Sequence, residues 1–216
     1  STRKESSAAS DVYKRQTRGV VVSSVNGMTA PYRVVAVSGS LHEPSKTTAL
    51  IRAIAGAIAE RAEVEIEVIE LTDIGPSLAG ALRRDQLPAS VEEKLVAIEA
   101  SDLLIVGSPV YRASFTGLFK HLFDFVGQYE LVGKPVLLAA TGGGERHALI
   151  IEHQLRPLFA FFQALTLPLG VYASDTDFDG YVIASDVLRA RIELAADRAL
   201  PLVGYAASRP VELLVS

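Results

Sequence analysis

One stretch of sequence decides the fold: Val34-Val35-Ala36-Val37-Ser38-Gly39-Ser40-Leu41-His42-Glu43-Pro44-Ser45-Lys46-Thr47-Thr48. It begins with the apolar residues of a buried strand, passes through a turn rich in hydroxyl groups and enters a helical pattern. Apolar residues then recur every four positions, at Leu50, Ile54 and Ile58. The first N–H groups of a helix have no partners within the helix, and the helix dipole favours negative charge there. The stretch therefore predicts a strand–turn–helix unit that binds a phosphate group.

The composition of the 216-residue chain fits one well-buried domain, with 49% hydrophobic residues. The net charge of −4 gives no electrostatic case for binding nucleic acid or an anionic membrane. The absence of cysteine excludes disulfides and thiolate chemistry and favours a cytoplasmic location. No apolar run reaches the roughly 18 residues of a membrane span.

The two ends of the chain differ from its middle. Residues 1–18 show no apolar period, the run Val20-Val21-Val22 is too short for a signal-peptide core, and the only methionine is Met28. We expect residues 1–30 to be a non-native or disordered leader, with a native arm that contacts a neighbouring subunit as the alternative. Residues 31–206 then form a single domain, and 207–216 a C-terminal tail.

Strand and helix patterns alternate after residue 32. A loop is predicted around Gly75, Pro76 and Gly80. Strands are predicted at 33–37, 64–71, 102–107, 134–141 and 167–172, and helices at 47–61, 88–100, 116–126, 147–164 and 186–200. This alternation predicts an α/β fold: a five-stranded parallel sheet with helices on both faces. Because no Gly-x-Gly-x-x-Gly follows the first strand, we prefer the flavodoxin-like strand order 2-1-3-4-5.

Ligands of such sheets bind at the carboxyl ends of the strands, where the strand order reverses. The first loop there offers five hydroxyl groups, on Ser38, Ser40, Ser45, Thr47 and Thr48. It lacks the Gly-Lys-Ser/Thr ending of a nucleoside-triphosphate loop and the cysteine of a phosphatase loop. A phosphate would therefore be held rather than attacked. The alternative is a simple helix cap by Ser45 or Thr47.

The second loop, residues 108–117, follows the third strand. Pro109 ends the strand, Tyr111 supplies a flat ring, and Arg112 supplies a charge that could meet the phosphate of a nicotinamide dinucleotide. The alternative is an ordinary capped turn with Ser114 as the N-cap. This loop alone does not separate the two interpretations.

The third loop is Thr141-Gly142-Gly143-Gly144-Glu145-Arg146-His147. Its glycines let the backbone approach a planar ring with no side chain in the way. Its amides could donate to the carbonyl and nitrogen atoms of a flavin pyrimidine edge. A flexible surface turn is the alternative. The convergence of three such loops on one edge is stronger support than any single loop.

With these loops the chain resembles the NAD(P)H-dependent FMN reductases of flavodoxin-like fold. It most resembles the alkanesulfonate- and methanesulfonate-type members, which supply reduced flavin to two-component monooxygenases of sulfonate and sulfone sulfur assimilation. The likeness runs from about residue 32 to about residue 206. The matching motifs are Gly39-Ser40 through Pro44-Ser45 to Thr48, then Ser108-Pro109-Val110-Tyr111 with Ser114, Gly117, Lys120 and Asp124, then Thr141-Gly142-Gly143 with His147.

The resemblance implies that FMN and NADPH or NADH bind at this edge and that hydride passes directly between them, with no catalytic side chain. FMN would behave more like a substrate than a fixed cofactor. The phosphate would contact Ser40, Ser45, Thr47 and Thr48, and the ring would lie against Pro109, Val110, Tyr111 and Ser114, with Thr141 to Gly144 at its pyrimidine side. Ser38, Arg112 and His147 complete the expected binding set. His42 stands where many relatives have Arg, so its contact with the phosphate is expected to be weaker.

Two alternatives to this function stay open. The first is a quinone, azo-dye or chromate reductase with tightly bound FMN. The second is a flavodoxin-like electron carrier, although such carriers are usually more acidic than this chain. The choice between NADH and NADPH also stays open, because Arg112 and Arg146 could both reach a 2′-phosphate.

The helix predicted after the glycine loop is apolar on most sides. Seven of the eight Phe residues fall between Phe115 and Phe162. An apolar helix on the flank of a domain needs a cover, and a second subunit is the usual one. We therefore expect a homo-oligomer, with a tetramer as the preferred form. Deep burial within one chain is the alternative.

His153 has a specific interpretation on this helix. The resemblance implies an inserted residue here, which makes a π-bulge at a tetramer interface, and counting back from Arg156-Pro157 places it at His153. Pro157 also leaves one carbonyl without its helical donor. The alternative is an ordinary interface histidine. No metal site is expected, because His147 and His153 lie about 240° apart around a helix.

Overall fold

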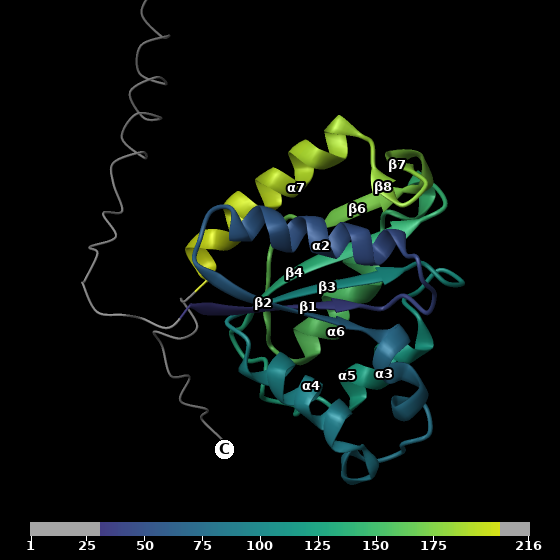
Figure 1. Cartoon of the computed structure of the whole chain (residues 1–216), viewed down its shortest axis with the longest axis vertical. Coiled ribbons are helices and arrows are strands. Elements are labelled where there is room, and N and C mark those ends of the chain that lie inside the picture. The colour runs from purple at the N-terminus through teal and green to yellow at the C-terminus, as the bar shows by residue number, and fades with distance from the viewer. Residues whose placement is uncertain (1–30, 204–216) are drawn as a thin grey trace, which may run out of the picture. The chain divides into compact units, whose positions relative to one another are not determined.

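The computed structural model describes residues 31–203. The predictions for the leader, for the C-terminal tail and for the last residues of the domain lie outside this range. Within it, strands and helices alternate as the sequence indicates (Figure 1). No helix in this part of the chain is long and apolar enough to cross a lipid bilayer.

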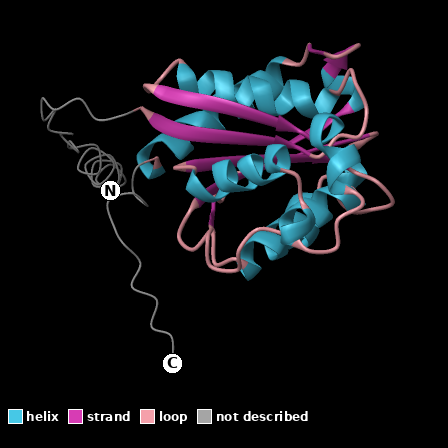
Figure 2. Ribbon diagram, turned by 60° about the horizontal axis from the view of Figure 1, so that its bottom comes forward, coloured by secondary structure: helices cyan, strands magenta, loops and turns pink. Residues whose placement is uncertain are grey.

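The described residues contain one central sheet of six parallel strands (Figure 2). Its order is β2-β1-β3-β4-β5, with β6 also paired to β4, which confirms the predicted flavodoxin-like order. The strands are β1 (Tyr32–Ser38), β2 (Val64–Glu70), β3 (Leu103–Pro109), β4 (Pro135–Gly142), β5 (Leu165–Thr166) and β6 (Val171–Ser174). The inner strands β3 and β4 are buried up to their last residues and are mostly apolar, because helices cover both of their faces.

Helices form a layer on each face of the sheet, as Figure 1 shows. One layer holds α2 (Lys46–Ala59) and α7 (Asp186–Ala199). The other holds α3 (Leu71–Leu78), α4 (Ala89–Ala100), α5 (Gly117–Asp124) and α6 (Arg156–Phe161). Short 3-10 turns lie at Arg84–Gln86, Glu145–His147, Asp175–Asp177 and Leu200–Leu202. A small antiparallel hairpin joins β7 (Phe178–Asp179) to β8 (Val182–Ile183).

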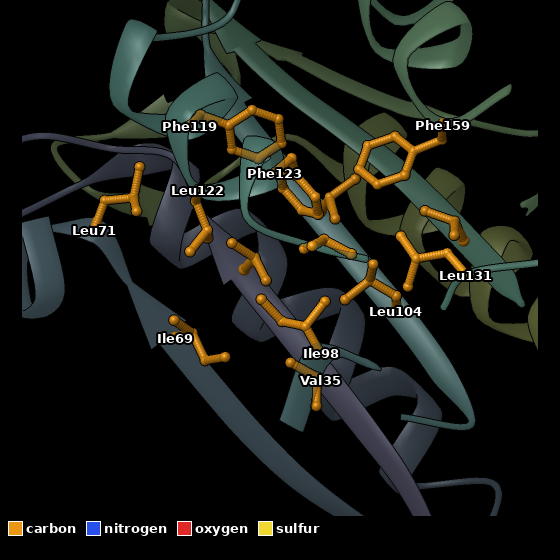
Figure 3. Packing of buried hydrophobic residues seen from close by; sticks show 14 of the residues in the cluster. Val35, Ile69, Leu71, Ile98, Leu104, Phe119, Leu122, Phe123, Leu131 and Phe159 are labelled. Carbon is orange, nitrogen blue, oxygen red and sulfur yellow. The ribbon is translucent and has the colours of Figure 1, made fainter. Parts of the chain in front are cut away.

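An aromatic cluster fills the core beneath α5 and α6 (Figure 3). Phe119, Phe123 and Phe159 are fully buried, and the rings of Phe123 and Phe159 meet edge-on with centroids 4.9 Å apart. Burial within one chain therefore accounts for most of the apolar residues that we assigned to a subunit contact. Leu149 and Phe161 stay exposed, at 63% and 61%.

The loop predicted around Gly75 and Pro76 is wrong, because these residues lie in α3. Leu71, Ile74 and Leu78 recur on one face of this helix and are buried. Gly75 lets α3 pack closely on α5, since a Cβ there would lie 2.7 Å from Leu118 Cδ2 and would displace that side chain. Pro76 is tolerated because it removes only a hydrogen bond to the first turn of the short helix.

The strand predicted at 167–172 is only partly right, because residues 167–170 connect β5, which ends at Thr166, to β6, which begins at Val171. Pro168 interrupts it because proline has no N–H to donate to a ladder. The guanidinium of Arg156 instead donates to the carbonyl of Leu167, at 3.0 Å. The two short strands pair with opposite ends of β4, so the carboxyl end of β6 still reaches the ligand-binding edge.

The helix predicted at 147–164 is irregular, as the resemblance implied. A π-helix spans Ile151–Leu155 and contains His153. The N–H of Arg156 donates to the carbonyl of Ile151, five residues back. Pro157 follows directly and cannot donate to the preceding turn. The predicted irregularity of this helix is therefore present, and the identity of His153 as the inserted residue and its place at a subunit interface stay predictions.

Candidate functional site

The three loops converge on a pocket of about 360 Å³ at the carboxyl edge of the sheet. The pocket lies where β1 and β3 are neighbours, with β4 alongside. Ten predicted site residues line it: Ser40, His42, Ser45, Thr47, Pro109, Val110, Tyr111, Thr141, Gly142 and Gly143. Six others do not: Ser38, Thr48, Arg112, Ser114, Gly144 and His147.

Three hydroxyl groups of the first loop lie around the start of α2. Ser45 is the N-cap, and its Oγ accepts a hydrogen bond from the N–H of Thr48 at 3.2 Å. Ser40 Oγ donates to the carbonyl of His42 at 3.1 Å, which closes the turn. The hydroxyls of Thr47 and Thr141 are 2.6 Å apart and tie the first loop to the end of β4. Capping is thus one role of this loop, but it uses only Ser45.

Ser38 and Thr48 point into the protein instead. Their hydroxyls are 2.8 Å apart, and Thr48 Oγ1 donates to Glu70 Oε2 at 3.1 Å. Glu70 also forms an ion pair with Arg52 at 2.5 Å. Because this chain of hydrogen bonds engages both hydroxyls, Ser38 and Thr48 support the loop from beneath and do not line the pocket.

The second loop folds into a tight two-residue turn. Tyr111 and Ser114 exchange backbone hydrogen bonds, and Arg112 and Ala113 between them have φ values of 51° and 68°. Two left-handed residues in succession define a type I′ turn, a strained choice for residues other than glycine. The turn places Arg112 at an exposed tip, away from the pocket lining.

Thr116, and not Ser114, caps the helix that follows the second loop. Thr116 Oγ1 accepts from the N–H of Phe119 and donates to the carbonyl of Gly39 at 2.8 Å. Ser114 Oγ instead donates to Gln154 Oε1 in the π-helix, at 3.1 Å. The second loop is therefore joined to the first loop on one side and to the π-helix on the other.

The third loop is held from behind by Tyr172 of β6. The Tyr172 hydroxyl donates to the carbonyl of Gly144 at 2.6 Å. A Cβ on Gly142 would lie 2.5 Å from that same hydroxyl oxygen and 3.2 Å from His147 Cβ, so a larger residue there would have to displace the tyrosine. Burial raises the pKa of Tyr172, and nearby Glu145 adds to the effect. The hydroxyl therefore keeps its proton and donates at neutral pH.

Six residues of the pocket lining are outside the predicted set: Pro44, Lys46, Ser174, Asp175, Phe178 and Tyr181. Pro44 and Lys46 lie within the first loop but were passed over for the hydroxyls beside them. Ser174 ends β6, and the other three lie on the connection after β6 and on the β7–β8 hairpin. The rule that ligands bind at the carboxyl ends of strands applies to the last strand as well, so this connection could have been included.

A second hollow, of about 400 Å³, lies on the far side of the glycine loop. Its lining includes Glu145, Glu152 and Asp177, which make it acidic, and Arg191, whose guanidinium donates to the carbonyl of Gly170 at 2.8 Å. It lacks the hydroxyl-rich loop of the first pocket, and its acidic side chains make it a poor site for a phosphate. Within residues 31–203, no group of three or more His, Asp or Glu side chains is placed to hold a metal ion.

Comparison with known proteins assigns the chain to a family. The profile of NADPH-dependent FMN reductases matches residues 32–179. The chain belongs to the NADPH-dependent FMN reductase family. It is 56% identical over 177 residues to FMN reductase (NADPH) of Pseudomonas aeruginosa, an alignment that covers 82% of this chain and 95% of that protein. It is 55% identical, with the same coverage, to NADH-dependent FMN reductase SfnF of Pseudomonas fluorescens.

Solved structures agree with this assignment. An oxidoreductase from Corynebacterium diphtheriae superposes with a TM-score of 0.75 at 33% identity, over 82% of this chain and 99% of that one. The apo form of the NADH:FMN oxidoreductase EMOB superposes with a TM-score of 0.74 at 29% identity, over 85% of this chain and 97% of that one.

The residues of the pocket fit the FMN that this family binds. The start of α2 and the hydroxyl of Ser45 offer hydrogen-bond donors suited to a phosphate, and the hydroxyls of Ser40 and Thr47 lie beside them in the pocket lining. At the other end, Gly142 and Gly143 leave the backbone of the third loop accessible to a flat ring. The donor set and the bare backbone match an elongated ligand that is anionic at one end and planar at the other.

Proposed function

We propose that this chain reduces FMN with NAD(P)H and releases the reduced flavin to a two-component monooxygenase of sulfonate or sulfone sulfur assimilation. The observation that carries the proposal is the convergence of a phosphate-type helix start and a bare glycine loop on one pocket. Membership of the FMN reductase family and the names of its relatives support the activity. The resemblance to alkanesulfonate- and methanesulfonate-type reductases supports the monooxygenase partner.

In this proposal the side chains bind and orient, and none acts as acid, base or nucleophile. Ser40, Ser45 and Thr47 hold the phosphate, with a weaker contribution from His42. Pro109, Val110 and Tyr111 support the ring, and residues 141–144 contact its pyrimidine side. Bound FMN supplies the hydride chemistry, since it accepts a hydride from a reduced nicotinamide placed over its ring.

The experiment begins with gel filtration of the purified protein. NAD(P)H oxidation is then measured with and without added FMN, and with quinone or azo-dye acceptors. A colourless protein whose turnover depends strictly on added FMN supports the proposal. A retained yellow flavin with quinone or azo-dye turnover would favour the alternative reductase, and flavin binding without turnover would favour an electron carrier.

The same assay decides between the two nicotinamides. The relatives differ, since one is named for NADPH and another for NADH. We propose that the chain accepts both, and kcat/KM for each at saturating FMN measures the preference. The exposed Arg112 is the side chain to replace if NADPH is preferred, because a 2′-phosphate would gain from its charge.

We also propose a homotetramer built on the π-helix and α6, in a cytoplasmic enzyme. The support is the exposure of Phe161, which lines a hollow together with Leu158 and Phe162, and the exposure of Leu149, two residues before the π-helix. Exposed apolar groups of this kind are usual at subunit contacts. Light scattering at micromolar concentration tests the idea: four times the chain mass is expected, Phe161→Glu should lower it, and a monomeric mass would contradict the proposal.

A further inference from the structure

An ion pair crosses the phosphate end of the pocket. Lys46 is the first residue of α2, and its Nζ lies 2.7 Å from Oδ1 of Asp175. Asp175 begins the turn that follows β6, so the pair joins two segments 129 residues apart in the chain. Lys46 Nζ also lies 5.6 Å from the centre of the Phe178 ring. These contacts hold the ammonium group at the pocket.

Lys46 is placed to serve a phosphate as well. It stands between Ser45 and Thr47, both of which line the pocket, and its own side chain is only 28% exposed. A phosphate at the start of α2 would lie within reach of this ammonium group. Asp175 is more open to solvent, at 61%. The cation is therefore more enclosed by the protein than its anionic partner, which faces solvent.

We propose that Asp175 competes with the phosphate of FMN for the ammonium of Lys46 and thereby weakens FMN binding. This inference rests on the proposed function and deepens it, because it names the pair that sets how readily FMN leaves. An exposed ion pair contributes little to stability, so its exchange for a phosphate is inexpensive. Asp175 also repels a phosphate held nearby, since both carry negative charge.

Asp175→Asn tests the inference by removing the charge and keeping the shape of the side chain. FMN and riboflavin are titrated into the protein and followed by flavin fluorescence. The dissociation constant for FMN should fall about threefold to tenfold, since a dianion several ångströms away interacts modestly through water. The constant for riboflavin, which has no phosphate, should stay unchanged.

Two further variants isolate the ion pair. Lys46→Gln should weaken FMN about tenfold and riboflavin little, and in the double variant with Lys46→Gln the gain from Asp175→Asn should shrink. Asp179→Asn is the matched control, because it removes the same charge from the β7–β8 hairpin at a residue that does not line the pocket. It should leave both constants unchanged.

The outcomes separate the two proposals. Unchanged or weaker FMN binding in Asp175→Asn would overturn the role of the ion pair and leave the FMN reductase proposal standing. An equal change for FMN and riboflavin would overturn it too, because the effect would then act on the ring. A wild-type protein that binds neither flavin would overturn both proposals. Thermal unfolding of each variant confirms that it is folded.

Discussion

Tyr172 donates a hydrogen bond of 2.6 Å to the carbonyl of Gly144. The bond runs from β6 to the glycine loop that follows β4, and β4 and β6 are paired in the sheet. A flexible run of three glycines would otherwise be free to take many conformations, which costs entropy when a ligand orders it. The hydrogen bond from Tyr172 therefore restricts the conformation of the loop before the flavin ring binds.

Replacing Tyr172 with Phe should weaken flavin binding without changing the chemistry. The loss of one hydrogen bond is worth about 1 kcal/mol, which corresponds to a rise of roughly fivefold in KM for FMN. We expect kcat to change less than twofold, because the ring and the nicotinamide meet as before. Steady-state kinetics measure both constants, with Tyr129→Phe, at an exposed tyrosine, as the control. A fall in kcat with an unchanged KM would contradict this account.

Gly142 and Gly144 should respond differently to alanine. A Cβ on Gly142 meets the hydroxyl oxygen of Tyr172 at 2.5 Å, whereas a Cβ on Gly144 meets nothing within 4 Å. Gly142→Ala must displace Tyr172 and should cost about 1–3 kcal/mol in the free energy of unfolding. Gly144→Ala should be close to neutral. Urea denaturation measures both, and equal stabilities would show that the loop is looser than described.

The sheet order and the three loops of the site were predictable, because apolar periods and the carboxyl-end rule depend only on local sequence. The role of each individual hydroxyl group in the first loop could not be predicted in this way. Ser38 and Ser40 look alike in the sequence, but Ser38 is bonded to Thr48 and Ser40 faces the pocket. Their difference arises because β1 ends at Ser38, so that Ser40 lies in the turn, and because Glu70 of the next strand engages Thr48 beside Ser38. The sequence of the loop alone does not reveal tertiary partners of this kind.

The failure to predict α3 and the Lys46–Asp175 ion pair also has physical reasons. In α3, the apolar face of Leu71, Ile74 and Leu78 outweighs the helix-breaking tendency of Gly75 and Pro76, since burial stabilises a helix more than propensity does. The pairing of Lys46 with Asp175 could not be predicted, because it depends on where the connection after β6 returns.

Lys134 should make stability depend on pH. Its side chain is buried, its ammonium donates to the carbonyl of Ser101, and burial lowers its pKa below the ordinary value of 10.5. The unfolded chain then binds the proton more tightly than the folded chain. The free energy of unfolding therefore receives a contribution that rises with pH, up to about pH 10.5, as the folded protein loses this proton.

Lys134→Met removes that contribution while keeping an unbranched side chain. Urea denaturation at a series of pH values should show wild type gaining stability relative to the variant as the pH rises toward 10.5. The other titrating groups are common to both proteins and cancel in the difference. A constant difference across the series would show that Lys134 keeps its ordinary pKa in the folded protein.

Deleting His153 should convert the π-helix into an α-helix and tighten FMN retention. A π-turn holds one residue more than the α-helical turn, so the deletion lets the hydrogen bond from the N–H of Arg156 return to the ordinary four-residue spacing. Ser114 Oγ donates to Gln154 Oε1 in this helix, so a shift there reaches the second flavin loop. We expect slower release of flavin and a lower turnover when release limits the rate.

His153→Ala is the matched control for that deletion, because it removes the imidazole but keeps the residue count. It should retain the π-helix and the wild-type rate of flavin release. Stopped-flow dilution of FMN-loaded protein measures the release rate in all three proteins. If the deletion releases flavin at the wild-type rate, the π-helix has no part in release. If His153→Ala matches the deletion instead, the imidazole and not the inserted residue controls release, and the helical geometry is only its support.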